Sequence, residues 1–164
     1  KENSKSILVD HRAGSWGQAT WRREWSQFKI NKMFYLKKLK QDKIFYRRVI
    51  ASGKDLIEMA YADFKGNIDS VGVWWCLYII YNKGLTIHPS KTYIVNKGMD
   101  DYATHSNKTK YFLSKFTKSK KIRLPYVISI DKEFAILHKK FNGPNFLAKI
   151  KIKFQNFLFR YLSK

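Results

Sequence analysis

The chain has 164 residues and a net charge of +21, because 33 Lys and Arg outnumber 12 Asp and Glu. Hydrophobic residues make up 45% and aromatic residues 16%, which excludes a disordered basic tail and indicates one folded domain with a real core. The positive field attracts polyanions: nucleic acid, an anionic membrane surface or a phosphorylated ligand. The single cysteine, Cys76, excludes an internal disulfide and a cysteine-based zinc site, and its apolar neighbours indicate a buried thiol.

The first third of the chain is predicted to be a short strand followed by two helices. Residues 6–10 form the strand, and a first helix runs from about residue 18 to residue 28. A second helix over residues 31–50 has a mixed basic and aromatic surface. The i, i+4, i+7 spacing predicts that the buried face of the first helix comprises Trp21, Trp25 and Phe28.

The central part is predicted to contain an amphipathic helix and then the most apolar helix. After the break at Gly53, an apolar face defines a helix that ends at Gly66; this face comprises Leu56, Met59, Ala60 and Phe64. The next helix, from residue 71 to about residue 83, is apolar nearly all round and should be central. Asp69 or Ser70 is expected to cap it.

The remaining chain is predicted to begin with two short strands, residues 85–87 and 92–95, around a turn at Pro89. A polar loop and a lysine-rich connector follow, and a helix is expected over residues 131–141. The last segment, residues 145–164, is basic and amphipathic, as in a helix on an anionic membrane surface; packing against its own domain is the alternative. No apolar run is long enough to span a bilayer.

Two tryptophans and two glycines lie close together in residues 14–21. An indole face beside glycine can stack against a sugar ring, because glycine lets ligand atoms approach closely. Alternatively, Trp16 and Trp21 are core residues near a turn.

Three further side chains are candidates for chemistry. Asp55 and Asp69 lie at predicted helix starts, where a carboxylate can be a cap or a general base. His105 lies in a polar loop near two aspartates and can ligate a divalent metal, although a lone loop histidine is more often simply exposed. The other histidines, His11, His88 and His138, have no comparable setting. No P-loop, G-x-G-x-x-G, H-E-x-x-H, C-x-x-C or D-x-D motif is present.

The order of the short motifs resembles the C-terminal, acceptor-side half of bacterial family 2 glycosyltransferases with the GT-A fold. In this chain the motifs are SWGQATW (15–21), GKDL (53–56), GNIDS (66–70), NKG (96–98) and ATH (103–105). The resemblance covers residues 12–106. Three positions depart from the family pattern and put the acceptor specificity in question: Gln18, Val71 and Trp74.

This resemblance implies an α/β fold: a partial GT-A (nucleotide-diphospho-sugar transferase-like) domain that is mainly helical here, with short strands and a helical C-terminal extension. The implied boundaries are an acceptor-side part over residues 1–107, a basic connector over 108–130 and a basic amphipathic helical extension over 131–164. The family's nucleotide-binding half, with its D-x-D motif, is not in this sequence, so the isolated chain is expected to be inactive.

The resemblance also assigns roles to residues. Trp16, Gly17, Thr20 and Trp21 would shape the acceptor-sugar site. Asp55 or Asp69 would deprotonate the acceptor hydroxyl; the choice stays open, with Asp55 preferred because the family's acidic pair after glycine maps there. His105 would help to hold a divalent metal, Mn or Mg, or the diphosphate.

The function expected from the resemblance is transfer of a sugar from a nucleotide-sugar donor to a saccharide or lipid-linked acceptor, in surface polysaccharide or lipopolysaccharide synthesis. The enzyme would be cytoplasmic and peripheral on the inner face of the cell membrane, held there by the C-terminal helix. One alternative is a non-catalytic basic module that binds nucleic acid or an anionic membrane. Nucleic acid is not the expected partner, because no nucleic-acid-binding motif is present. A membrane-associated scaffold that has lost transferase activity is a third reading.

Overall fold

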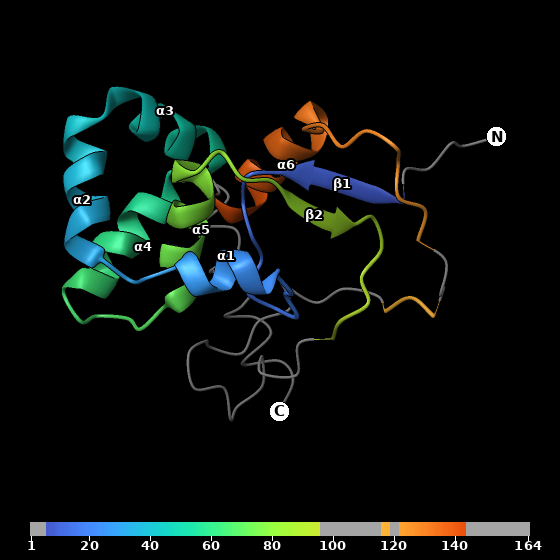
Figure 1. The fold of residues 1–164 in the computed structure, drawn as a ribbon, viewed down its shortest axis with the longest axis horizontal. Helices are drawn as coiled ribbons and strands as arrows, with labels where there is room; N and C mark the ends of the chain where they lie inside the picture. The colour runs from blue at the N-terminus through green and yellow to red at the C-terminus, as the bar shows by residue number, and fades with distance from the viewer. Residues whose placement is uncertain (1–5, 96–115, 119–121, 144–164) are drawn as a thin grey trace, which may run out of the picture.

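The computed structural model describes residues 6–95, 116–118 and 122–143. In chain order its elements are β1 (Ile7–Asp10), α1 (Arg22–Gln27), α2 (Lys32–Gln41), α3 (Lys43–Ser52), α4 (Asp55–Phe64), α5 (Val71–Tyr81), β2 (Thr86–Pro89) and α6 (Lys132–Asn142). Helices α2 to α5 pack together on one side of the molecule, and the two strands lie on the other side with α6 next to β1 (Figure 1). The described part is therefore mainly helical, with a two-stranded sheet.

Helix α5 is the centre of the core, as its all-round apolar sequence predicts. Seven of its eleven residues are buried, and α2, α3 and α4 pack against it. Burying each large apolar side chain contributes about 1.5–3 kcal/mol, and Trp74 is 1% exposed. The prediction that Cys76 is a buried thiol is confirmed, and burial raises its pKa to about 11.

The predicted single helix over residues 31–50 is wrong, because the structure divides it into α2 and α3 at Asp42. The carboxylate of Asp42 accepts hydrogen bonds from the backbone N–H groups of Ile44 and Phe45, at 3.0 and 2.9 Å. These bonds satisfy donors that are free at a helix start, so Asp42 begins a new helix. Asn31 caps α2 in the same way through the N–H of Phe34.

The predicted helix over residues 18–28 is much shorter, and its predicted buried face is wrong. Helix α1 begins only at Arg22, because the chain turns at Gly17, which has φ of +62°, and stays extended at Trp21. Trp21 is 72% exposed and Trp25 is 49% exposed, while Phe28 is half-buried. The spacing that indicated one buried face therefore does not fall on one continuous helix.

The sheet is a single antiparallel pair in which Asp10 lies opposite Thr86 and Leu8 lies opposite His88. The strand predicted before Pro89 is confirmed, but the predicted turn at Pro89 is wrong, because β2 continues to Pro89 itself. Residues 92–95 do not form a strand; only Thr92 makes an isolated bridge, with Phe116.

The prediction of a helix over residues 131–141 is confirmed by α6. The side chain of Asp131 accepts a hydrogen bond from the N–H of Phe134, and its own N–H donates to the Val9 carbonyl of β1. The helix thus begins at the sheet edge and packs along β1.

Several predictions fall on residues outside the described part: the polar loop from residue 96, His105, most of the lysine-rich connector and the segment 145–164. Within the described ranges, no helix has both the length and the apolar character needed to cross a bilayer.

Candidate functional site

The loop that holds the first motif packs against the start of α5. A Cβ added at Gly72 would lie 3.3 Å from the Cβ of Ser15 and 3.9 Å from the hydroxyl of Ser70. In the same loop, Gly17 lies so close to the Ile94 side chain that any Cβ there would collide with it. The loop around residues 15–17 therefore contacts two segments that lie far from it in the sequence, residues 70–72 and Ile94.

Tryptophans of this loop face solvent. Trp16 is 45% exposed and Trp21 is 72% exposed, so the interpretation of both as core residues is wrong. Trp25 is also half exposed, and its ring lies against that of Trp75, with centroids 5.4 Å apart. Exposed indoles offer an apolar face and a polar N–H, which makes them candidates for ligand contact. Gly17 and Thr20 are exposed beside them.

Asp69 is exposed next to this loop, and the prediction that Asp69 or Ser70 caps α5 with its side chain is wrong. Ser70 occupies the cap position without a side-chain hydrogen bond to the helix. Among the residues that the structure describes, the Asp69 carboxylate has no hydrogen bond or ion pair, so it remains available to a ligand.

A residue that sequence reasoning missed, Asp63, fixes the backbone beside Asp69. Its carboxylate accepts hydrogen bonds from the N–H of Ser70 at 2.7 Å and from the indole of Trp74 at 2.9 Å, and it pairs with Lys32 at 2.5 Å. Burial alone would raise the pKa of Asp63, but Lys32, the Ser70 N–H and the Trp74 indole outweigh it and lower the pKa below its usual value.

Asp55 is in a different situation, because Arg12 holds it in a two-pronged ion pair. The guanidinium donates to the two carboxylate oxygens at 2.9 and 2.5 Å, and the side chains are 8% and 17% exposed. Such a carboxylate already has its lone pairs engaged by a fixed cation. The structure does not bring Asp55 and Asp69 together through any contact among the described residues, although they lie at the starts of adjacent helices.

Gly53 is required by this ion pair. It has φ of +145°, and a Cβ there would collide with the Arg12 guanidinium and the Asp55 carboxylate. We expect Gly53→Ala to lower the free energy of unfolding by about 1–3 kcal/mol, measured by urea denaturation. Gly66→Ala is the matched control, because Gly66 has φ of +77° but has open space around it. An equal loss in both variants would contradict the crowding at Gly53.

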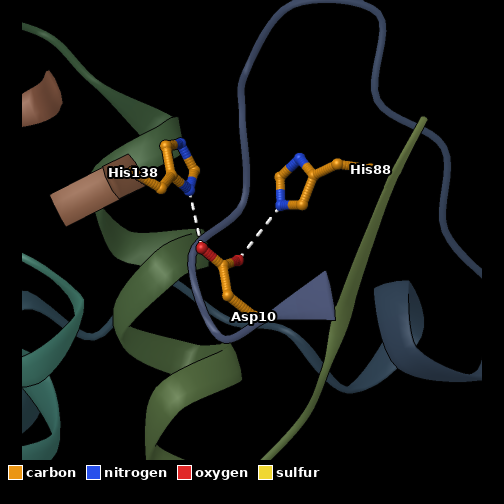
Figure 2. A group of neighbouring side chains, drawn as sticks. All are labelled: Asp10, His88 and His138. Carbon is orange, nitrogen blue, oxygen red and sulfur yellow. Dashed lines mark hydrogen bonds and ion pairs between the residues drawn. The ribbon is translucent and has the colours of Figure 1, made fainter. Parts of the chain in front are cut away.

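A second group of side chains gathers where β1, β2 and α6 meet. Asp10, His88 and His138 each offer one ligand atom, and these atoms lie within 4.8 Å of one another (Figure 2). Burial alone would raise the pKa of Asp10, but hydrogen bonds from His138 and His88 and the charges of these rings outweigh it and lower the pKa from 3.8 to about 2. Sequence reasoning set both histidines aside, and they lie 78 and 128 residues from Asp10.

Comparisons with protein-family models, with curated proteins and with solved structures found no match for this chain. Its function must therefore be argued from the residues and their arrangement.

Proposed function

We propose that this chain is the acceptor-side part of a GT-A family 2 glycosyltransferase, which transfers a sugar from a nucleotide-sugar donor to a saccharide or lipid-linked acceptor. The observation that carries the proposal is the packing of the SWGQATW loop against the start of α5, directly after the GNIDS motif. Ser15 of SWGQATW lies against Gly72, two residues after the GNIDS motif, and Gly17 of the same loop lies against Ile94. Motifs that form one binding site in the family should converge in this way.

The exposed tryptophans supply the acceptor site in this proposal. The indole faces of Trp16 and Trp21 give a sugar ring an apolar surface for stacking, and Gly17 between them adds no side chain that would block it. Surface-polysaccharide and lipopolysaccharide acceptors present sugar rings of this kind. Thr20, also exposed, offers a hydroxyl to the same region.

Of the two candidate bases, Asp69 fits the chemistry better than Asp55. In an inverting transfer the acceptor oxygen attacks the anomeric carbon, its proton passes to a carboxylate, and the nucleoside diphosphate leaves. The base needs a carboxylate that is open to the acceptor hydroxyl. Asp69 is exposed next to the motif loop, whereas the Asp55 carboxylate is occupied by Arg12. We therefore assign the base to Asp69 and a structural role, in the ion pair with Arg12, to Asp55.

The divalent metal that the family uses at its donor site, Mn or Mg, has no matching ligands among the described residues. These ions prefer carboxylate and carbonyl oxygens, whereas the cluster of Asp10, His88 and His138 offers two imidazoles. The role of His105 at the metal or diphosphate, with the nucleotide sugar itself, stays a prediction.

A location at the inner face of the membrane is part of the proposal and is supported by charge. The net charge of +21 favours an anionic leaflet. On the helical side of the molecule, an open pocket of about 330 Å³ is lined by Leu39, Lys40, Lys43, Tyr46 and Arg47. Its cations and apolar side chains also fit the alternative function, a non-catalytic basic module on an anionic surface.

We expect acceptor-type oligosaccharides to bind this chain and to change its tryptophan fluorescence. Trp16→Ala and Trp21→Ala should each weaken binding about 10-fold, equivalent to ~1.4 kcal/mol, because stacking area is lost. At Trp21 stability should change little, since its side chain is 72% exposed.

Tyr126→Ala is the matched control, because Tyr126 is a fully exposed aromatic residue outside the motif loop. Unchanged saccharide affinity in both tryptophan variants would contradict the acceptor platform.

A further inference from the structure

The cluster of Asp10, His88 and His138 joins three elements that the chain connects only over long distances. Asp10 ends β1, His88 lies in β2, and His138 lies in the middle of α6. Asp10 and His88 share one face of the antiparallel pair, because Asp10 is opposite Thr86 and His88 is two residues further along. Helix α6 brings His138 to that face, and both rings point toward the carboxylate (Figure 2).

Each histidine lies close to a different oxygen of Asp10. Nε2 of His88 is 3.1 Å from Oδ1 of Asp10, and Nδ1 of His138 is 2.6 Å from Oδ2. A tetrahedral zinc ion with bonds of about 2.0–2.1 Å separates its ligand atoms by roughly 3.3 Å. The ligand atoms of the cluster lie within 4.8 Å of one another, so side-chain rotations that close the widest separation by up to roughly 1.5 Å would bring them to an ion. The side chains are 6%, 19% and 17% exposed for Asp10, His88 and His138, which leaves the cluster partly open to an entering ion.

Their surroundings hold the three side chains in place. Nε2 of His88 also lies 3.0 Å from the carbonyl oxygen of Arg12, a contact that a bound ion would replace. The N–H of Arg12 donates to Oδ1 of Asp10 at 2.9 Å. The ring of Phe134 stacks on that of His138, with centroids 5.0 Å apart, and lies 5.2 Å from that of His88. The nearby positive charge of Arg12 is paired with Asp55, which reduces its repulsion of a cation.

An independent observation on the same face is the hydroxyl of Thr86, opposite Asp10 in the register. This atom is buried, and within the described part of the chain it has no hydrogen-bond partner. A buried hydroxyl without a partner costs free energy, so natural proteins normally give it one. A water bound to a metal ion on this face would provide that partner.

We propose that Asp10, His88 and His138 bind a divalent transition-metal ion, best matched by zinc, with a water as the fourth ligand. Two imidazoles and one carboxylate are a donor set that zinc accepts in tetrahedral sites. The ion fastens α6 to the two-stranded sheet, because its ligands come from all three elements. This site is independent of the proposed transferase function, since neither its residues nor its preferred metal are those expected at the sugar donor.

The test is zinc titration of the full, chelator-treated chain in competition with a chromophoric chelator. We expect one equivalent of zinc to bind and to raise the thermal midpoint, because binding to the folded state alone stabilises it. His88→Gln and His138→Asn preserve a hydrogen-bond donor near the original Nε2 and Nδ1 positions. Each should weaken zinc binding at least about 100-fold, since even changes around metal ligands cost roughly 10–100-fold.

His11→Gln is the control, because His11 is half-buried and hydrogen-bonded to Gly84 but lies outside the cluster; it should bind zinc like the parent. If a cluster variant does not fold, X-ray absorption spectroscopy of the zinc-loaded parent protein identifies the ligands. We expect scattering from two imidazoles. Absence of stoichiometric binding, equal affinity in the cluster variants, or a spectrum without two imidazoles would overturn the proposal and leave a hydrogen-bonded triad.

Discussion

Replacing Asp69 by Asn is expected to lower sugar transfer by the full-length gene product by about 10²–10⁴-fold, the usual effect of removing a general base. Asparagine keeps the size of the side chain but cannot accept the proton. Because Asp69 is exposed and makes no hydrogen bond with the described residues, the free energy of unfolding should change by less than about 0.5 kcal/mol. The measurement is kcat with a labelled nucleotide sugar, together with urea denaturation.

Asp55→Asn is the comparison variant for Asp69→Asn. It breaks the nearly buried pair with Arg12 and leaves the guanidinium without its carboxylate, so a loss of stability of about 3 kcal/mol is expected. In Asp55→Asn, the loss of activity should therefore match the loss of folded protein. In Asp69→Asn, activity should fall although the protein remains folded. Full turnover in Asp69→Asn, or lost turnover in a stable Asp55→Asn, would contradict the assignment of the base.

The second large effect is expected at Asp63. Asp63→Ala should lower the free energy of unfolding by about 3–5 kcal/mol, because the Ser70 N–H, the buried Trp74 indole and Lys32 all lose their acceptor. Lys32→Ala is the control, with an expected loss of at most about 1 kcal/mol, since its side chain is 40% exposed. Similar losses in both variants would mean that the ion pair, rather than the buried acceptor, stabilises the start of α5.

The same residue gives stability a defined pH dependence. The pKa of Asp63 is lower in the folded chain than its unfolded value of about 3.9, so the unfolded state binds the proton more readily. Its contribution is therefore present above about pH 4 and is lost as the pH falls through the lower folded pKa. Urea denaturation of Asp63→Ala should show a correspondingly smaller loss of stability in acid than the parent does.

Local patterns were sufficient for much of the fold. The apolar sequence of α5 predicted both a helix and its central position, and Gly53 and Gly66 correctly bracket α4. The division at Asp42 escaped prediction because basic and aromatic residues continue across it, so only the cap marks the break. The predicted buried face of α1 is wrong because the chain turns at Gly17 and the helix begins only at Arg22. The spacing of apolar residues does not reveal such a turn.

The candidate sites were harder to predict than the helices, because they depend on contacts between residues that are far apart in the sequence. The tryptophans could be singled out because their motif is local, but whether they are buried depends on packing against distant residues. Asp63 carries no local signal, since its partners lie on two other segments of the chain. His88 and His138 look ordinary in sequence and become a cluster only when the sheet register and the docking of α6 place them beside Asp10.

The central claim, that these motifs are the acceptor side of a glycosyltransferase, is tested most directly by sequencing the gene upstream of the Lys1 codon. The account predicts an open reading frame that encodes alternating strands and helices with a D-x-D motif. A stop codon followed closely by a start site would contradict it, because the chain would then have no donor-binding half to complete the enzyme.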